Sequence, residues 1–121
     1  MKKLLITLML ISPFSFADWG DVYYCDMTTH SGTTVEGEKK LYKLDKFQFK
    51  LDKARNAMVF GKGGYFSGSL LGLWFAEGVS YAEYWYAGDN LARAYFDKGK
   101  FLYSYTGTTG IVSISANCDK F

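Results

Sequence analysis

Residues 100–118 read KFLYSYTGTTGIVSISANC, and this stretch decides the fold class. Apolar and polar side chains alternate on both sides of a GTTG turn. A period of two is typical of β-strands, because successive side chains point to opposite faces of a sheet. The stretch therefore predicts an antiparallel β-hairpin with one buried and one solvent-exposed face. The alternate apolar positions of its second strand end at Cys118.

The N-terminus has the pattern of a secretory signal peptide. Two lysines precede an apolar run, and the small residues Ser15 and Ala17 occupy the −3 and −1 positions of a cleavage site. The apolar run is shorter than the ~20 residues that a helix needs to span a bilayer. We therefore expect residues 1–17 to be a signal peptide, residues 18–121 to form a single all-β domain, and the protein to be periplasmic or secreted.

The two cysteines, Cys25 and Cys118, lie near the two ends of that domain. Two cysteines in an exported chain are typical of one disulfide, which here would join the first strand to the last. The alternative, a pair of free thiols, is typical of cytosolic chains and does not fit a secretory leader.

Turn residues recur about every ten positions, which favours a small barrel or sandwich. Residues 28–37 are polar and predict a loop that contains His30, the only histidine. Residues 91–97 fit a short helix or a strand, and the hairpin turn DKGK at 97–100 favours the strand. Further strands are expected at residues 18–27, 39–51, 57–60, 65–75 and 79–87. We predict an all-β protein, a small antiparallel β-barrel or sandwich of seven to nine strands closed by one disulfide.

Charge is balanced overall but uneven along the chain. Without the two leader lysines there are 12 basic and 12 acidic residues, which gives no reason to expect nucleic-acid binding. Residues 36–62 nevertheless hold eight basic and four acidic side chains. Lys39, Lys40 and Lys43 form a candidate basic patch for an anionic envelope polymer or an acidic partner. The alternative is a solvated strand face whose lysines discourage edge pairing.

Aromatic residues make up 19% of the chain and mark the second candidate site. The candidate binding residues are Trp74, Tyr81, Tyr84, Trp85 and Tyr86, whose rings would form a platform for a sugar or an apolar ligand. The alternative is that these rings fill a small β-core. Residues 65–75 and 79–87 are apolar on both faces, so we expect one of Trp74 and Trp85 in the core and the other in a partly open patch.

Catalytic and metal-binding motifs are weak in this sequence. One histidine and two paired cysteines cannot build a usual zinc site, and the acidic residues are scattered. The GKGG stretch at 61–64 lacks the spacing of a phosphate loop, and there is no nucleophile elbow. A carboxylate pair for glycoside hydrolysis is invisible in sequence. We expect no cofactor and no metal ion, and an enzyme is less favoured than a non-enzymatic protein.

Several short segments carry a resemblance: YYC at 23–25, FQF at 47–49, VFG at 59–61, Trp85 and NCDKF at 117–121. They resemble those of a group of short secreted proteins, known from marine bacterial and phage sequences, that have no assigned function. The resemblance covers most of residues 18–121 and implies no activity. The layout is also similar to that of periplasmic lysozyme inhibitors, but their serine-and-glycine inhibitory loop motif is not evident here.

These features predict an exported, non-enzymatic binding or interaction protein of the periplasm or extracellular space. Its partner is unknown, and an envelope polymer or envelope protein is the candidate. The alternatives are a small envelope-polymer hydrolase and a lysozyme-inhibitor-like periplasmic protein. A third candidate, an integral outer-membrane barrel, would need apolar residues at positions 113, 115, 117 and 119, which are Ser, Ser, Asn and Asp. We therefore do not expect an integral membrane protein.

Overall fold

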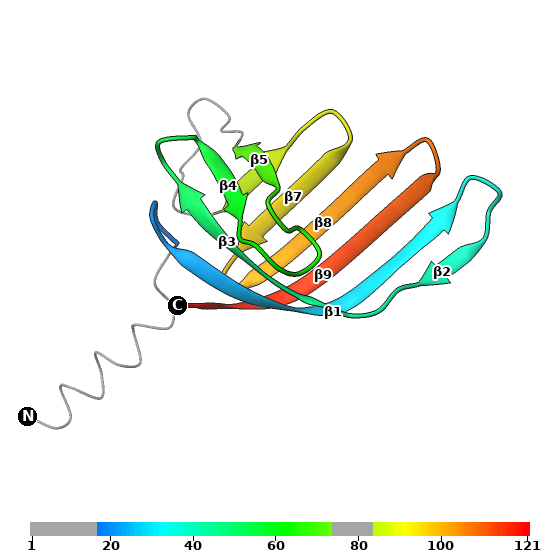
Figure 1. Cartoon of the computed structure of the whole chain (residues 1–121), viewed down its shortest axis with the longest axis horizontal. Helices are drawn as coiled ribbons and strands as arrows, with labels where there is room; N and C mark the ends of the chain where they lie inside the picture. The colour runs from blue at the N-terminus through cyan, green and yellow to red at the C-terminus, as the bar shows by residue number, and fades with distance from the viewer. Residues whose placement is uncertain (1–16, 74–83) are drawn as a thin grey trace, which may run out of the picture.

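The computed structural model describes residues 17–73 and 84–121, which form nine β-strands and no helix (Figure 1). In chain order the strands are β1 (Val22–Thr34), β2 (Lys39–Leu41), β3 (Lys46–Asp52), β4 (Ala57–Phe60), β5 (Leu70–Leu73), β6 (Trp85–Gly88), β7 (Ala92–Asp97), β8 (Lys100–Gly107) and β9 (Gly110–Lys120). All pairings are antiparallel, and the pairing of β9 with β1 closes eight strands into a barrel. β2 is an additional strand on β1. The predicted fold class is confirmed, as a barrel. Within the described residues, no helix is long and apolar enough to cross a membrane.

The seam between β1 and β9 carries the disulfide. This pairing runs from Tyr23 opposite Lys120 to Thr34 opposite Gly110. Cys25 lies directly opposite Cys118, and the two sulfur atoms are bonded. The predicted disulfide is therefore confirmed, and it joins the first barrel strand to the last.

A β-bulge between Met27 and Thr29 divides β1 into two parts. The first part pairs with β3 and the second with β2. The bulge adds one residue to β1, so the inward-facing positions change from odd to even numbers. Met27 faces inward before the bulge, and His30 faces inward after it. The tips of the β1–β2 and β8–β9 hairpins lie side by side (Figure 1).

Two expectations about this region are wrong. Residues 28–34 are strand rather than loop, because β9 is long enough to pair with β1 as far as Thr34. The single strand expected at residues 39–51 is two strands, β2 and β3. They separate because β2 pairs with the second part of β1, whereas β3 pairs with the first.

Aromatic rings fill the barrel. The packed rings belong to Tyr23, Phe47, Phe49, Phe60, Phe66, Phe96 and Phe101. Phe101 is completely buried, and its ring centroid lies 4.9 Å from that of Phe47 and 5.8 Å from that of Phe49. Apolar burial on this scale is the main favourable term in folding a small domain.

The loop between β4 and β5 contributes one of these rings. Phe66 is buried, and its ring lies 4.9 Å from Phe47 and 4.6 Å from Phe60. Residues 65–69 were expected to be strand, but they form turns and β5 begins at Leu70. The turns bring Phe66 back over the barrel interior, which a straight strand does not do.

Gly63 and Gly64 of this loop provide a matched test of its approach to β3. Both have φ in the left-handed region, +88° and +82°, so alanine costs a similar backbone strain of about 1–2 kcal/mol at each. A Cβ on Gly64 would lie 2.0 Å from the Lys46 carbonyl oxygen, whereas a Cβ on Gly63 would meet nothing within 4 Å. We expect Gly64→Ala to lower the urea midpoint clearly more than Gly63→Ala. Equal midpoints would contradict the close approach.

Candidate functional site

The structure separates the predicted aromatic residues. Trp85 is 3% exposed and packs against Trp19, with ring centroids 5.0 Å apart, so it is a core residue. Tyr86 is the next residue of β6, so its side chain faces outward, where it is half-buried. Tyr84 precedes β6 and is also half-buried. Trp74 and Tyr81 lie outside the described residues. The predicted platform thus keeps Tyr84 and Tyr86 and loses Trp85 to the core.

A groove of about 530 Å³ lies on the outer face of β7, β8 and β9 and is named here the tyrosine groove. Its outward-facing lining consists of Thr29, Tyr86, Arg93, Tyr95, Leu102, Ser104, Ser113 and Ser115. Strand register arranges these side chains in two cross-strand rows. One row runs Tyr86, Tyr95, Leu102, Ser115 and Thr29, and the other Arg93, Ser104 and Ser113. Rings therefore gather at one end and hydroxyls at the other.

Tyr95 is held in place by its neighbours. Its ring stacks on that of Tyr84, with centroids 5.5 Å apart and planes 25° from parallel. Its hydroxyl donates a long hydrogen bond of 3.5 Å to Asp97. Desolvation and the negative charge of Asp97 raise the pKa of Tyr95.

Arg93 lies at the rim of the tyrosine groove. Its Nη1 donates to the carbonyl oxygen of Ala92, at 3.0 Å, and to that of Asp89. The Asp89 carboxylate in turn accepts the backbone N–H groups of Leu91 and Ala92, and these bonds lower its pKa. Arg93 was not predicted as a site residue, because only the pairing of β7 with β8 places it beside Ser104.

A second groove, of about 320 Å³, lies over β2, β1 and β9 and is named here the lysine groove. Its lining consists of Ser31, Gly32, Thr33, Lys39, Lys40, Leu41, Ile111 and Ser113. Of the three predicted lysines, Lys39 is opposite Thr33 and is on the outward-facing side of this lining. Lys40 is opposite Gly32, so it borders the groove from β2 while its side chain is on the other face of that strand, and Lys43 is exposed outside the groove. No acidic side chain is part of this lining. The ion pairs found among the described residues involve Lys46, Arg55 and Lys120 instead.

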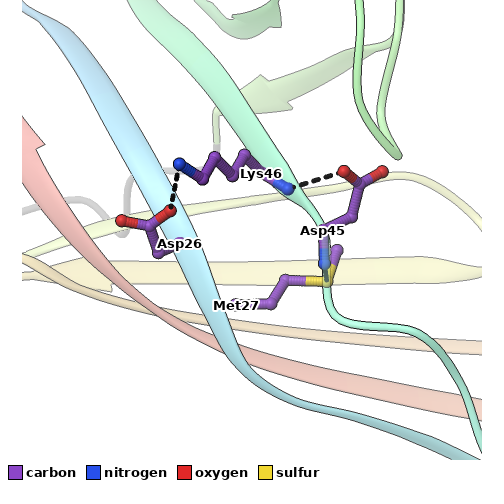
Figure 2. A network of polar contacts seen from close by, with 4 residues as sticks. All are labelled: Asp26, Met27, Asp45 and Lys46. Atoms are coloured by element: carbon purple, nitrogen blue, oxygen red, sulfur yellow. Dashed lines mark hydrogen bonds and ion pairs between the residues drawn. The ribbon is translucent and has the colours of Figure 1, made fainter.

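A third groove, of about 420 Å³, lies between β1, β3 and the loop at residues 61–64, and it contains acidic groups. Lys46 lies between two of them: its Nζ is 3.7 Å from Asp26 Oδ1, and its backbone N–H donates to Asp45 Oδ1 at 2.8 Å (Figure 2). Asp45 also donates its backbone N–H to the Met27 sulfur. The Lys46 ammonium thus accompanies the Asp26 carboxylate, whereas the Asp45 carboxylate accepts a neutral backbone N–H. Among the described residues, no three His, Cys, Asp or Glu side chains are grouped so as to hold a metal ion.

His30 takes part in aromatic packing. It is 8% exposed, its ring centroid lies 4.8 Å from those of Tyr42 and Tyr65, and its Nδ1–H donates to the Lys43 carbonyl oxygen at 3.1 Å. Burial raises the pKa of Tyr65, and it raises that of the nearby Tyr103 to about 12. The contacts found for His30 are with rings and a carbonyl rather than a carboxylate, so they do not form an acid–base pair.

Comparison of the chain with protein-family models, curated proteins and solved structures found no match.

Proposed function

We propose that the chain is an exported, non-enzymatic binding protein of the periplasm or extracellular space, and that its lysine groove binds an anionic polymer of the cell envelope. The observation that carries the proposal is a groove with Lys39 on its outward-facing side, with Lys40 bordering it from the edge strand β2, and with no acidic side chain in its lining. Such a lining attracts polyanions, because each lysine adds a favourable Coulomb term and no carboxylate opposes it.

The barrel interior supports a role for the outer surface. Phe49, Phe96 and Phe101 are at most 1% exposed, and the Phe49 ring packs against each of the other two. The described part of the barrel interior is therefore closely packed with side chains, and this supports a ligand site on the outer surface.

The disulfide supports the proposed compartment. Disulfides persist in oxidising environments, and the bond between Cys25 and Cys118 fits the periplasm or the extracellular space. The expected leader at residues 1–17 agrees with that location.

The contacts of the candidate catalytic groups favour binding over hydrolysis. His30 is occupied by ring packing and by the Lys43 carbonyl oxygen. In the acidic groove the Lys46 ammonium lies beside Asp26 and the Lys46 backbone N–H donates to Asp45, whereas glycoside hydrolysis needs two carboxylates that face a substrate bond. An envelope-polymer hydrolase is therefore the less supported reading.

The charge reversal Lys39→Glu/Lys40→Glu tests the proposal. We expect it to weaken binding to polygalacturonate and to inorganic polyphosphate about tenfold or more, since two attractive terms become repulsive. Binding by the unsubstituted protein should also weaken steeply between low and physiological salt. Isothermal titration calorimetry at two salt concentrations measures both effects.

The control is Lys50→Glu/Lys53→Glu, which changes the net charge equally at two exposed lysines outside the groove. We expect it to change affinity less than threefold. An equal loss in both double variants would mean that net charge alone attracts the polymer, and salt-insensitive binding, or no binding to either polyanion, would overturn the proposal.

A further inference from the structure

We infer that the tyrosine groove and the lysine groove form one continuous track, and that the ligand is a linear acidic polysaccharide whose sugar rings stack on the tyrosines while its carboxylates meet the lysines. This inference rests on the proposed function and adds the chemical class of the ligand and a second part of the site.

The two grooves are joined by the strand register. Ser113 lines both of them. One cross-strand row runs from Arg93 in β7 through Ser104, Ser113 and Ser31 to Leu41 in β2. This row crosses five neighbouring strands, which at their usual spacing of about 4.8 Å gives a length of roughly 19 Å. A track of this length suits an extended polymer rather than a single small molecule.

The tyrosine end fits a sugar ring. A pyranose has an apolar face of C–H groups and a rim of hydroxyls, so it needs a flat ring below it and hydrogen-bonding groups beside it. Tyr86 and Tyr95 are opposite each other on neighbouring strands, and the stacked Tyr84 holds Tyr95 in place. Tyrosine suits such a site because its ring is apolar and its hydroxyl is polar.

The middle of the track supplies hydroxyl groups. Ser104 and Ser113 are exposed and opposite each other on β8 and β9. Ser115 joins a chain of hydroxyls, with its Oγ 2.7 Å from Thr28 Oγ1 and 2.6 Å from Thr29 Oγ1. Serine and threonine both donate and accept, as sugar hydroxyls do, so they can exchange hydrogen bonds with a glycan in several registers.

The lysine end selects an acidic polymer among glycans. Lys39 is on the outer face of that end and Lys40 borders it from the edge strand β2, and neither groove has an acidic side chain in its lining. A neutral glycan would match only the tyrosine end, and a polyphosphate would match only the lysine end. A linear polyuronate carries sugar rings and carboxylates in the same repeat and therefore matches both.

Leu102→Glu tests the tyrosine end of the track without changing a residue of the lysine groove. Leu102 is 52% exposed, lines the tyrosine groove and is not part of the lysine groove. A carboxylate there should repel a polyuronate, so we expect at least tenfold weaker binding of polygalacturonate oligosaccharides, with polyphosphate binding changed less than threefold. The matched control is Leu70→Glu at another strand position, 50% exposed and outside both grooves, and we expect no effect on either ligand.

The outcomes separate the two proposals. If Leu102→Glu leaves polygalacturonate affinity unchanged while Lys39→Glu/Lys40→Glu abolishes it, the continuous track is wrong and the proposed function stands. Binding to neither polyanion would reject both proposals. Sedimentation that shows a dimer of the unsubstituted protein, dissociated by Leu102→Glu, would assign this face to self-association and overturn the glycan track.

Discussion

Replacing Phe101 with alanine is expected to lower the free energy of unfolding by about 3–5 kcal/mol. The Phe101 ring is completely buried and contacts rings from three other parts of the barrel, namely Phe49 in β3, Phe60 in β4 and Phe66 in the β4–β5 loop. Alanine loses the transfer free energy of the ring and leaves a cavity that surrounding strands cannot fill without moving. Since small domains are stable by only about 5–15 kcal/mol, this single change removes a large share of the total.

Urea unfolding followed by tryptophan fluorescence and circular dichroism measures this loss. Leu102→Ala is the control, because Leu102 is the next residue of β8 but points outward and is 52% exposed. We expect it to cost less than about 1 kcal/mol, as substitutions of exposed residues usually do. Similar losses in the two variants would contradict the assignment of Phe101 to the shared ring cluster.

Removing the disulfide is the second large effect. The double variant Cys25→Ala/Cys118→Ala is expected to unfold with a free energy about 2–5 kcal/mol lower than that of the oxidised protein. The bond joins residues 93 positions apart, so in the unfolded chain it restricts nearly the whole domain. In the folded chain it lies on the β1–β9 seam, where strand pairing already brings the two residues together. The cost therefore arises mainly from greater freedom of the unfolded state.

Reduction of the unsubstituted protein provides the control for this variant. A reducing agent should shift its urea midpoint to near that of the double variant, apart from the small effect of the alanines, and should leave the double variant unchanged. A midpoint that does not respond to reduction would contradict a stabilising role for the bond. Intact mass of the protein recovered from the periplasm, two hydrogens below the reduced value, would verify that the bond forms there.

The hairpin and the turns were predictable because their signals are local. The alternation in residues 100–118 predicted β8 and β9 and their buried face, and the structure confirms Phe101, Ile114 and Cys118 as buried. The DKGK turn joins β7 to β8, with positive φ at Lys98 and Gly99, and Asn56 at the β3–β4 turn also has a positive φ, which asparagine tolerates. Each of these features depends on residues within a few positions of one another.

The second half of β1 was not predictable, because it has no local strand signal. Its outward side chains, including Ser31 and Thr33, are hydroxyls, and its inward positions are His30 and Gly32, so the stretch has no apolar alternation. It becomes a strand because β9 extends far enough to pair with it. Pairing between segments distant in sequence supplies the hydrogen bonds that local propensity does not indicate.

The candidate track, likewise, was predictable from the sequence only in part. Sequence alone marked Lys39 and Lys40 by local charge, and Tyr84 and Tyr86 by aromatic density, but it could not tell that Trp85 faces the core. Only the barrel register brought β7, β8, β9, β1 and β2 together, so that Ser113 lies between the two grooves. Side-chain period and turn chemistry are properties of neighbouring residues, whereas a surface site spans strands whose register is set by closing the whole sheet.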